Sequence, residues 1–255
     1  MSTFILIHGA WHGAWVWDRV AEQLRSAGHT VHTPDLPGHG QDKTPVQQVT
    51  LHAYVERVCN VIDQCDGPVI LAGHSMGGLV ISQAAEKRPG QILSLAYICA
   101  FLLRNGQSLV EEASKDTAAV VMPNVVFSAD HLAATLRPEV LREAFYADCS
   151  EEDYRRACSL LVRQATAPFA TPLQLSDENF GHVPRLYVEC VQDRAITLPA
   201  QRAMHQATPC DRVLTLDCSH SPFFAKPREL VECLLAATSL QAPKRGRAAI
   251  SPART

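Results

Sequence analysis

The sequence feature that most constrains the fold is residues 68–78, where an apolar run leads into Gly-His-Ser-Met-Gly centred on Ser75 and a helix-like segment follows at residues 79–88. A strand, a sharp turn and a helix in this order force the central residue into a strained backbone conformation. Gly73 and Gly77 are required because a Cβ there would collide with the neighbouring strand and helix. We therefore expect Ser75 to lie at the helix N-terminus, where free N–H groups favour the negative charge that a nucleophilic serine generates.

Short apolar runs alternate with segments of helical periodicity on both sides of this motif. The runs are too short for helices and are typical of buried strands, while the intervening segments repeat apolar residues at helical spacing. Such alternation predicts a mainly parallel sheet covered by helices on both faces. The expected strands are residues 4–7, 30–33, 68–72, 92–99, 185–191 and 212–216, and the expected helices are residues 15–24, 51–63, 79–88, 199–207 and 227–238.

The alternation breaks between residues 103 and 183. This stretch has a hairpin pattern at residues 125–135 and charged helical segments at residues 138–147 and 151–164. An interruption of this length predicts an inserted, mostly helical cap rather than a structureless loop. The expected division is therefore a single α/β domain over residues 1–240, with its core at 1–102 and 184–240 and its cap at 103–183.

Length and composition limit the kind of protein and the kind of binding partner that can be expected. With 255 residues, of which 47% are hydrophobic, the chain can bury one good core. The net charge of −3 argues against nucleic acid or an anionic membrane as the main partner. The apolar run at residues 4–7 is too short for a signal peptide or a membrane span, so we expect a cytoplasmic enzyme whose nine cysteines are reduced thiols. Residues 241–255 are basic, without apolar period, and are expected to form a solvated tail.

A serine hydroxyl is a weak nucleophile at neutral pH, so Ser75 needs a histidine base and a carboxylate that orients the base. His220 follows the last expected strand and therefore lies at the same end of the sheet as Ser75. Asp193 comes two residues after the strand at 185–191, again at the carboxyl ends of the strands. Asp217 is the competitor, but it precedes His220 so closely that it cannot easily reach the far ring nitrogen. The sequence favours Asp193 as the acid.

The oxyanion that forms when a serine attacks a carbonyl needs two convergent N–H donors. Met76, which follows the serine, supplies one donor in motifs of this kind, and the loop after the first strand supplies the other. Gly9 lets the backbone of that loop come close, so we expect Ala10 to be the second donor. His8 and His74 flank these two turns and are interpreted as packed, hydrogen-bonded histidines.

With these residues assembled, the chain resembles the α/β-hydrolase superfamily up to about residue 240. Its opening at residues 4–15 is similar to that of the plant methylesterase and hydroxynitrile lyase branch, which has bacterial carboxylesterase members, and the similarity continues at residues 28–31, 73–78, 139–154 and 187–193. The resemblance implies the α/β-hydrolase fold without a cofactor or a metal. It also implies a triad of Ser75, Asp193 and His220 with oxyanion amides at Ala10 and Met76.

Two positions separate the branches that this resemblance suggests. The lyases have a threonine at the position of Gly9 and a lysine just after the catalytic histidine, where this chain has Ser221. A lysine there would supply positive charge to the departing cyanide, and residues 218–223 offer no substitute. The two differences favour an esterase over a lyase.

The expected activity is therefore hydrolysis of small or medium, apolar or aromatic carboxylic esters through an acyl-enzyme on Ser75. The alternatives are a lyase that cleaves carbon-carbon bonds on the same scaffold and a slow-turnover or non-catalytic receptor for a small molecule. Thioesters and lactones would need the same machinery as esters. The oligomeric state is open, with a homodimer as one alternative. The residues expected to line the apolar pocket are Trp11, Met76, Phe101, Leu102, Phe127, Phe145 and Phe169.

Overall fold

A computed structural model describes residues 1–240, and the basic tail expected at residues 241–255 lies outside them. Six strands form one sheet in which every neighbouring pair is parallel. They are the six strands that the sequence predicts. In spatial order they are β2 (Thr30–His32), β1 (Thr3–Ile7), β3 (Val69–His74), β4 (Ile92–Ile98), β8 (Arg185–Cys190) and β9 (Arg212–Leu216).

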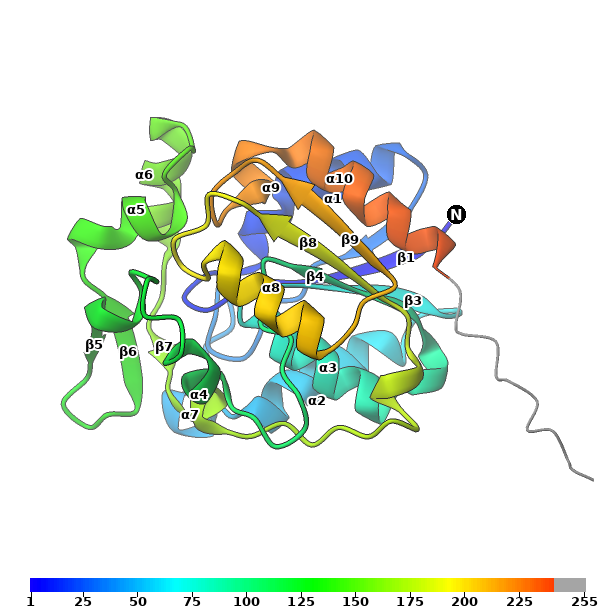
Figure 1. Ribbon diagram of the computed structural model, residues 1–255, viewed down its shortest axis with the longest axis horizontal. Coiled ribbons are helices and arrows are strands. Elements are labelled where there is room, and N and C mark those ends of the chain that lie inside the picture. Colours follow the sequence, from blue (N-terminus) through cyan, green and yellow to red (C-terminus); the bar gives the residue numbers. More distant parts are fainter. Residues whose placement is uncertain (241–255) are drawn as a thin grey trace, which may run out of the picture.

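Helices cover both faces of this sheet, which confirms the predicted parallel sheet enclosed by helices (Figure 1). Each helix turns an apolar side toward the sheet; Val20 and Leu24 of the first helix, for example, are fully buried. One face carries α1 (Asp18–Ser26), α9 (Pro222–Ala225) and α10 (Pro227–Ala236), and the other carries α2 (Leu51–Ile62), α3 (Gly77–Lys87) and α8 (Leu198–Ala207). Short 3₁₀ turns connect the elements at Ala14–Trp17, Val46–Gln48, Pro89–Gln91, Met122–Asn124, Pro138–Val140, Phe180–His182 and Ala237–Ser239.

Residues 103–183, called the cap below, interrupt the alternation between β4 and β8. The helices and short strands of the cap lie beside the carboxyl ends of the main strands, whereas residues 171–183 run back past α3 to the start of β8 (Figure 1). The cap combines four short helices with a three-stranded antiparallel sheet, and the pairing of its first two strands confirms the hairpin predicted at residues 125–135. Its helices are α4 (Leu109–Ala113), α5 (Leu141–Phe145), α6 (Glu151–Leu160) and α7 (Ala167–Ala170), and its strands are β5 (Val125–Phe127), β6 (Ala133–Leu136) and β7 (Gln164–Ala165).

The sequence predicts a helix at residues 151–164, and the predicted C-terminal end of this helix is wrong. Helix α6 stops at Leu160, and Gln164 lies instead in β7, which pairs with β6. Leu161 is extended, with a φ of −61° and a ψ of 140°. The N–H of Val162 then donates to the carbonyl oxygen of Trp11 at 2.9 Å rather than to the preceding helical turn. A contact with the core therefore ends this helix.

The strand order collects the candidate residues at one edge of the sheet. Strand β1 lies between β2 and β3, so the winding direction reverses there, and a crevice forms at the carboxyl ends of β1 and β3. The turn after β1 carries Ala10, and the turn after β3 carries Ser75. The neighbouring strands β8 and β9 are followed by the loops of Asp193 and His220.

Two expectations from composition concern the whole chain. All nine cysteines are free thiols, as predicted, and Cys59, Cys99, Cys190 and Cys233 are among the buried ones. Within residues 1–240, no helix is both long enough and apolar enough to cross a membrane. The cytoplasmic location stays a prediction.

Candidate active site

Ser75 lies in the tight turn between β3 and α3 with a φ of 54°. A Cβ on Gly73 would lie 2.7 Å from the carbonyl group of Gly77, and a Cβ on Gly77 would lie 2.8 Å from the carbonyl oxygen of Ile7. Both contacts are closer than real Cβ atoms tolerate, which confirms the predicted need for glycine at these positions. The N–H of Ser75 donates to the carbonyl oxygen of Ile98 at 3.3 Å and ties the turn to β4.

Asp193 and His220 form a buried pair. The Nδ1–H of His220 donates to Oδ2 of Asp193 at 2.7 Å, and the two residues are only 1% and 3% exposed. The other oxygen of Asp193 accepts the N–H groups of Ala195 at 2.7 Å and Ile196 at 2.9 Å. These bonds fix the carboxylate and place the imidazole proton on Nδ1, which leaves Nε2 available as a base. Asp217 is exposed and accepts a hydrogen bond from a glutamine instead.

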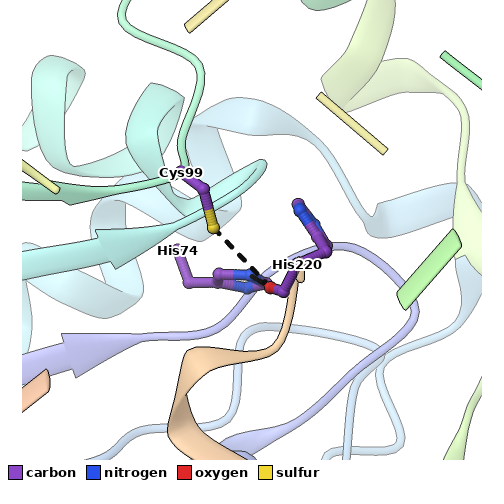
Figure 2. Close-up of side chains that lie close together, drawn as sticks. All are labelled: His74, Cys99 and His220. Carbon is purple, nitrogen blue, oxygen red and sulfur yellow. Dashed lines mark hydrogen bonds between the residues drawn. The ribbon is translucent and has the colours of Figure 1, made fainter. Parts of the chain in front are cut away.

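The backbone of His220 is anchored to the end of β3, which precedes Ser75, and to the end of the neighbouring strand β4. Its carbonyl oxygen accepts the Nε2–H of His74 at 2.8 Å and the S–H of Cys99 at 3.6 Å (Figure 2). The rings of His74 and His220 lie 4.6 Å apart between centroids. Because His74 directly precedes Ser75, this contact joins the loop of the histidine to the turn of the serine. His74 is therefore packed and hydrogen-bonded, as the sequence predicted.

The same three side chains have the composition of a metal site, since the candidate ligand atoms of His74, Cys99 and His220 lie within 4.8 Å of one another. Their hydrogen bonds argue for another role. His74 and Cys99 both point at the His220 carbonyl group (Figure 2), while Nδ1 of the His220 ring is bonded to Asp193. Burial also raises the pKa of Cys99 to about 12, which keeps the S–H that donates to this carbonyl group. We interpret the cluster as an anchor for the histidine loop.

The candidate oxyanion donors lie in adjacent turns. Within residues 1–240, neither the N–H of Ala10 nor the N–H of Met76 has an acceptor in the protein. The turn after β1 touches the serine, because a Cβ on Gly9 would lie 2.9 Å from the Cβ of Ser75. The Nδ1–H of His8 donates to the Gly9 carbonyl oxygen at 2.8 Å and so holds the peptide that carries the Ala10 N–H. Two free donors therefore lie beside Ser75.

A cavity of about 240 Å³ lies next to Ser75, between the core and the cap. Its walls are almost entirely apolar. The prediction that Leu102 lines the pocket is wrong. Leu102 is only 2% exposed, packs in the core and does not line the cavity. The residues predicted from the sequence that do line the cavity are Trp11, Met76, Phe101, Phe127, Phe145 and Phe169.

Three histidines around the site are buried. Burial lowers the pKa of His12 to about 3 and lowers the pKa values of His8 and His74 well below their ordinary value. In the unfolded chain each of them titrates near about pH 6.5. Below that pH the unfolded state binds protons that the folded state does not, so the free energy of unfolding decreases as the pH falls.

We therefore expect the urea midpoint of unfolding to decrease steadily between pH 7 and pH 5, because the free energy of unfolding falls with a slope of up to about 1.4 kcal/mol per pH unit for each buried histidine. Circular dichroism at intervals across this range measures the effect. His12→Gln should reduce the slope, whereas His52→Gln, at an exposed position, should leave it unchanged. A midpoint that stays constant from pH 7 to pH 5 would contradict the burial of neutral histidines.

Residues 4–233 match the family described as the alpha/beta hydrolase family. The chain belongs to this family. It is 32% identical over 248 residues to Methylesterase 7 of Arabidopsis thaliana, covering 91% of this chain and 94% of that protein. It is also 32% identical over 243 residues to the pyrethroid hydrolase of Sphingobium wenxiniae, covering 92% and 86%. The solved structure of a pyrethroid hydrolase from Sphingobium faniae superimposes with a TM-score of 0.82 at 28% identity, covering 93% of this chain and 98% of that one.

These relatives confirm the family resemblance read from the sequence and indicate that this alpha/beta hydrolase is an ester-hydrolysing enzyme. Sequence reasoning missed residues of the cap that contact the loops of the candidate triad. Asp148 accepts the N–H of Ser219, next to His220, at 2.9 Å, and Asp116 accepts the N–H of Thr197 at 2.8 Å. Single aspartates among other charged residues carry no signal that could have identified them.

Proposed function

We propose that this hydrolase cleaves small or medium, neutral carboxylic esters with apolar or aromatic groups through an acyl-enzyme on Ser75. The observation that carries the proposal is the buried Asp193–His220 pair beside an apolar cavity that Ser75 lines. Packing of the protein does not require a buried histidine–carboxylate pair beside a cavity. A serine nucleophile does require such a pair, because the carboxylate orients the histidine that takes the serine proton.

Each group has a defined role in the proposed reaction. Oγ of Ser75 attacks the ester carbonyl carbon while Nε2 of His220 takes its proton, and the N–H groups of Ala10 and Met76 stabilise the oxyanion. The tetrahedral intermediate collapses, and the leaving alkoxide takes the proton from His220. Water then attacks the acyl group with His220 as base, which releases the carboxylic acid and restores Ser75. Asp193 stabilises the imidazolium in both halves of the reaction.

The charge of the cavity supports neutral substrates. Within residues 1–240, its lining contains no lysine, arginine or histidine. Two carboxylates border it, and protein groups already use both: Asp116 accepts two hydrogen bonds from Thr197, and Glu112 pairs with Lys115 at 2.6 Å. A substrate carboxylate would lose its hydration there without gaining a partner.

The lyase alternative depends on two positions that argue against it. A Cβ at Gly9 would lie 2.9 Å from both Nδ1 of His74 and the Cβ of Ser75, so a threonine side chain has no room in this arrangement. Ser221 is fully buried and uncharged, and so supplies no positive charge for a leaving cyanide. The free donors and the oriented base also argue against a receptor that has lost catalysis.

A pair of esters of equal chain length tests the proposal. We expect kcat/KM for 4-nitrophenyl hexanoate to exceed that for mono-4-nitrophenyl adipate by roughly 100-fold or more, because only the adipate buries a charge. Initial rates from released 4-nitrophenolate give the ratio, with Ser75→Ala as the background. Equal rates on the two esters would contradict the neutral substrate class, and the lack of Ser75-dependent hydrolysis of any neutral ester would contradict the activity.

A further inference from the structure

Trp11, the residue after the candidate oxyanion donor Ala10, has a left-handed backbone conformation with a φ of 62°. Bulky L residues rarely adopt this conformation, which persists only where the surroundings hold it in place. The contacts of Trp11 therefore identify what holds the oxyanion turn.

All three polar groups of Trp11 bind to the cap. Its N–H donates to Oε1 of Gln164 at 3.4 Å, its carbonyl oxygen accepts the N–H of Val162 at 2.9 Å, and its indole N–H donates to the carbonyl oxygen of Ala134 at 3.0 Å. The indole ring also packs against two phenylalanines of the cap, at 5.8 Å between centroids in each case. The cap therefore determines the conformation of Trp11.

Gln164 is fully buried, and its amide uses every hydrogen-bonding position. Oε1 accepts the Trp11 N–H and the Nε2–H of His39 at 2.9 Å, while Nε2 donates to the hydroxyl of Tyr54 at 3.0 Å and the carbonyl oxygen of Ala165 at 2.8 Å. The two backbone partners fix which end of the amide is oxygen. Rotation of this amide would leave several buried groups without partners, so it is a rigid link between the cap and the turn.

The other side of the same peptide is also held through the cap. The carbonyl oxygen of Ala10 accepts the Nδ1–H of His12 at 2.6 Å. The remaining ring nitrogen of His12 accepts the hydroxyl of Tyr146, a cap residue, at 2.7 Å. His12 and Tyr146 are both buried. The Ala10–Trp11 peptide is thus bound at its carbonyl by this pair and at its N–H by Gln164.

We propose that the cap is a structural part of the oxyanion hole and that Gln164 is a positioning residue for it. By holding the planar Ala10–Trp11 peptide, Gln164 directs the preceding Ala10 N–H toward the oxyanion formed on Ser75. This inference rests on the proposed acyl transfer. It gives the cap a role in the chemical step in addition to shaping the cavity.

Gln164→Met tests the inference, because methionine has a similar shape and cannot replace the hydrogen bonds. We expect kcat for 4-nitrophenyl hexanoate to fall by roughly 10- to 100-fold with KM within about threefold of the wild type, since the affected donor acts in the transition state. An alkyl trifluoromethyl ketone forms an oxyanion adduct on the serine, so its affinity should fall by a similar factor. The matched methyl ketone should bind to both proteins equally.

Two further variants guard against a loss of folding as the explanation. Tyr146→Phe removes only the hydroxyl that holds His12 and should lower kcat by about threefold or more with the same effect on the trifluoromethyl ketone. Asp153→Asn is the matched control, because Asp153 is only 5% exposed and ties the cap to Arg19 of α1 at 2.7 Å, away from the turn. Asp153→Asn should keep kcat within about twofold of the wild type.

The outcomes separate this inference from the proposed function. A wild-type protein that hydrolyses no ester would remove the proposed function. An active wild type whose folded Gln164→Met and Tyr146→Phe variants keep their kcat and their affinity for the trifluoromethyl ketone would overturn the inference alone. The inference would also be overturned if Asp153→Asn lost as much kcat as Gln164→Met, since general loosening of the cap would then be the cause.

Discussion

Ser75→Ala and His220→Ala are each expected to lower kcat for 4-nitrophenyl hexanoate by roughly 10⁴-fold or more. Ser75 has no substitute nucleophile in its turn, and in the proposed mechanism His220 is the base that takes its proton. Because the two residues act in one proton transfer, the double variant should be about as slow as either single variant rather than slower by the product of the two effects.

A fluorophosphonate probe makes this expectation specific to Ser75. The probe should label the wild type on one serine and should fail to label Ser75→Ala. Ser26→Ala, which changes an exposed serine at the end of α1, should be labelled at the wild-type rate. Labelling that persists in Ser75→Ala would show that another residue is the nucleophile, whatever the ester rates are.

The parts of this site that the sequence predicts are those governed by local rules. Gly73 and Gly77 are needed for steric reasons that any strand-turn-helix of this tightness imposes, and the structure confirms both contacts. Most of the six strands are predicted because they are short apolar runs between helical periods, and the strand at residues 30–33 is predicted from the alternation of polar and apolar residues. Their parallel order then places the loops of Asp193 and His220 at one edge of the sheet without any knowledge of side-chain contacts.

The parts that the sequence does not predict depend on contacts between distant segments. Gln164 falls at the end of a helical pattern, yet pairing with Ala134 of β6 places it in a strand, and its side chain binds Trp11 and His39. Leu102 follows Phe101 and has the same apolar character, but only Phe101 reaches the cavity. Composition and period cannot distinguish such neighbours, because the direction of each side chain is set by the packing around it.

The cap contacts the loops that carry the candidate catalytic residues, which the break in the β-α pattern does not predict. Phe145 packs on the ring of His220 at 5.5 Å between centroids, and Asp148 accepts the N–H of Ser219, the residue before His220. Asp116 binds the loop of Asp193 through Thr197. Together with Gln164 at the oxyanion turn, these contacts connect the cap to every loop that carries a candidate catalytic group except the turn of Ser75.

Substitution of the two candidate aspartates tests which of them orients His220. We expect Asp193→Asn to lower kcat by roughly 10³-fold or more, whereas Asp217→Asn should cost less than about tenfold. The reason lies in the partners of Asp193. One oxygen accepts the N–H groups of Ala195 and Ile196, so an asparagine must place its own oxygen there and turn its NH₂ group toward His220.

An NH₂ group facing Nδ1 requires this nitrogen to accept, which moves the imidazole proton to Nε2 and removes the base that Ser75 needs. Asp217→Asn is the matched control, because it removes a carboxylate that is near His220 in the chain but is hydrogen-bonded to an exposed glutamine. Steady-state rates and the rate of fluorophosphonate labelling should fall together in Asp193→Asn, since both require proton transfer from Ser75. A large loss in Asp217→Asn with little change in Asp193→Asn would assign the acid to Asp217 and leave the buried Asp193–His220 contact without a catalytic role.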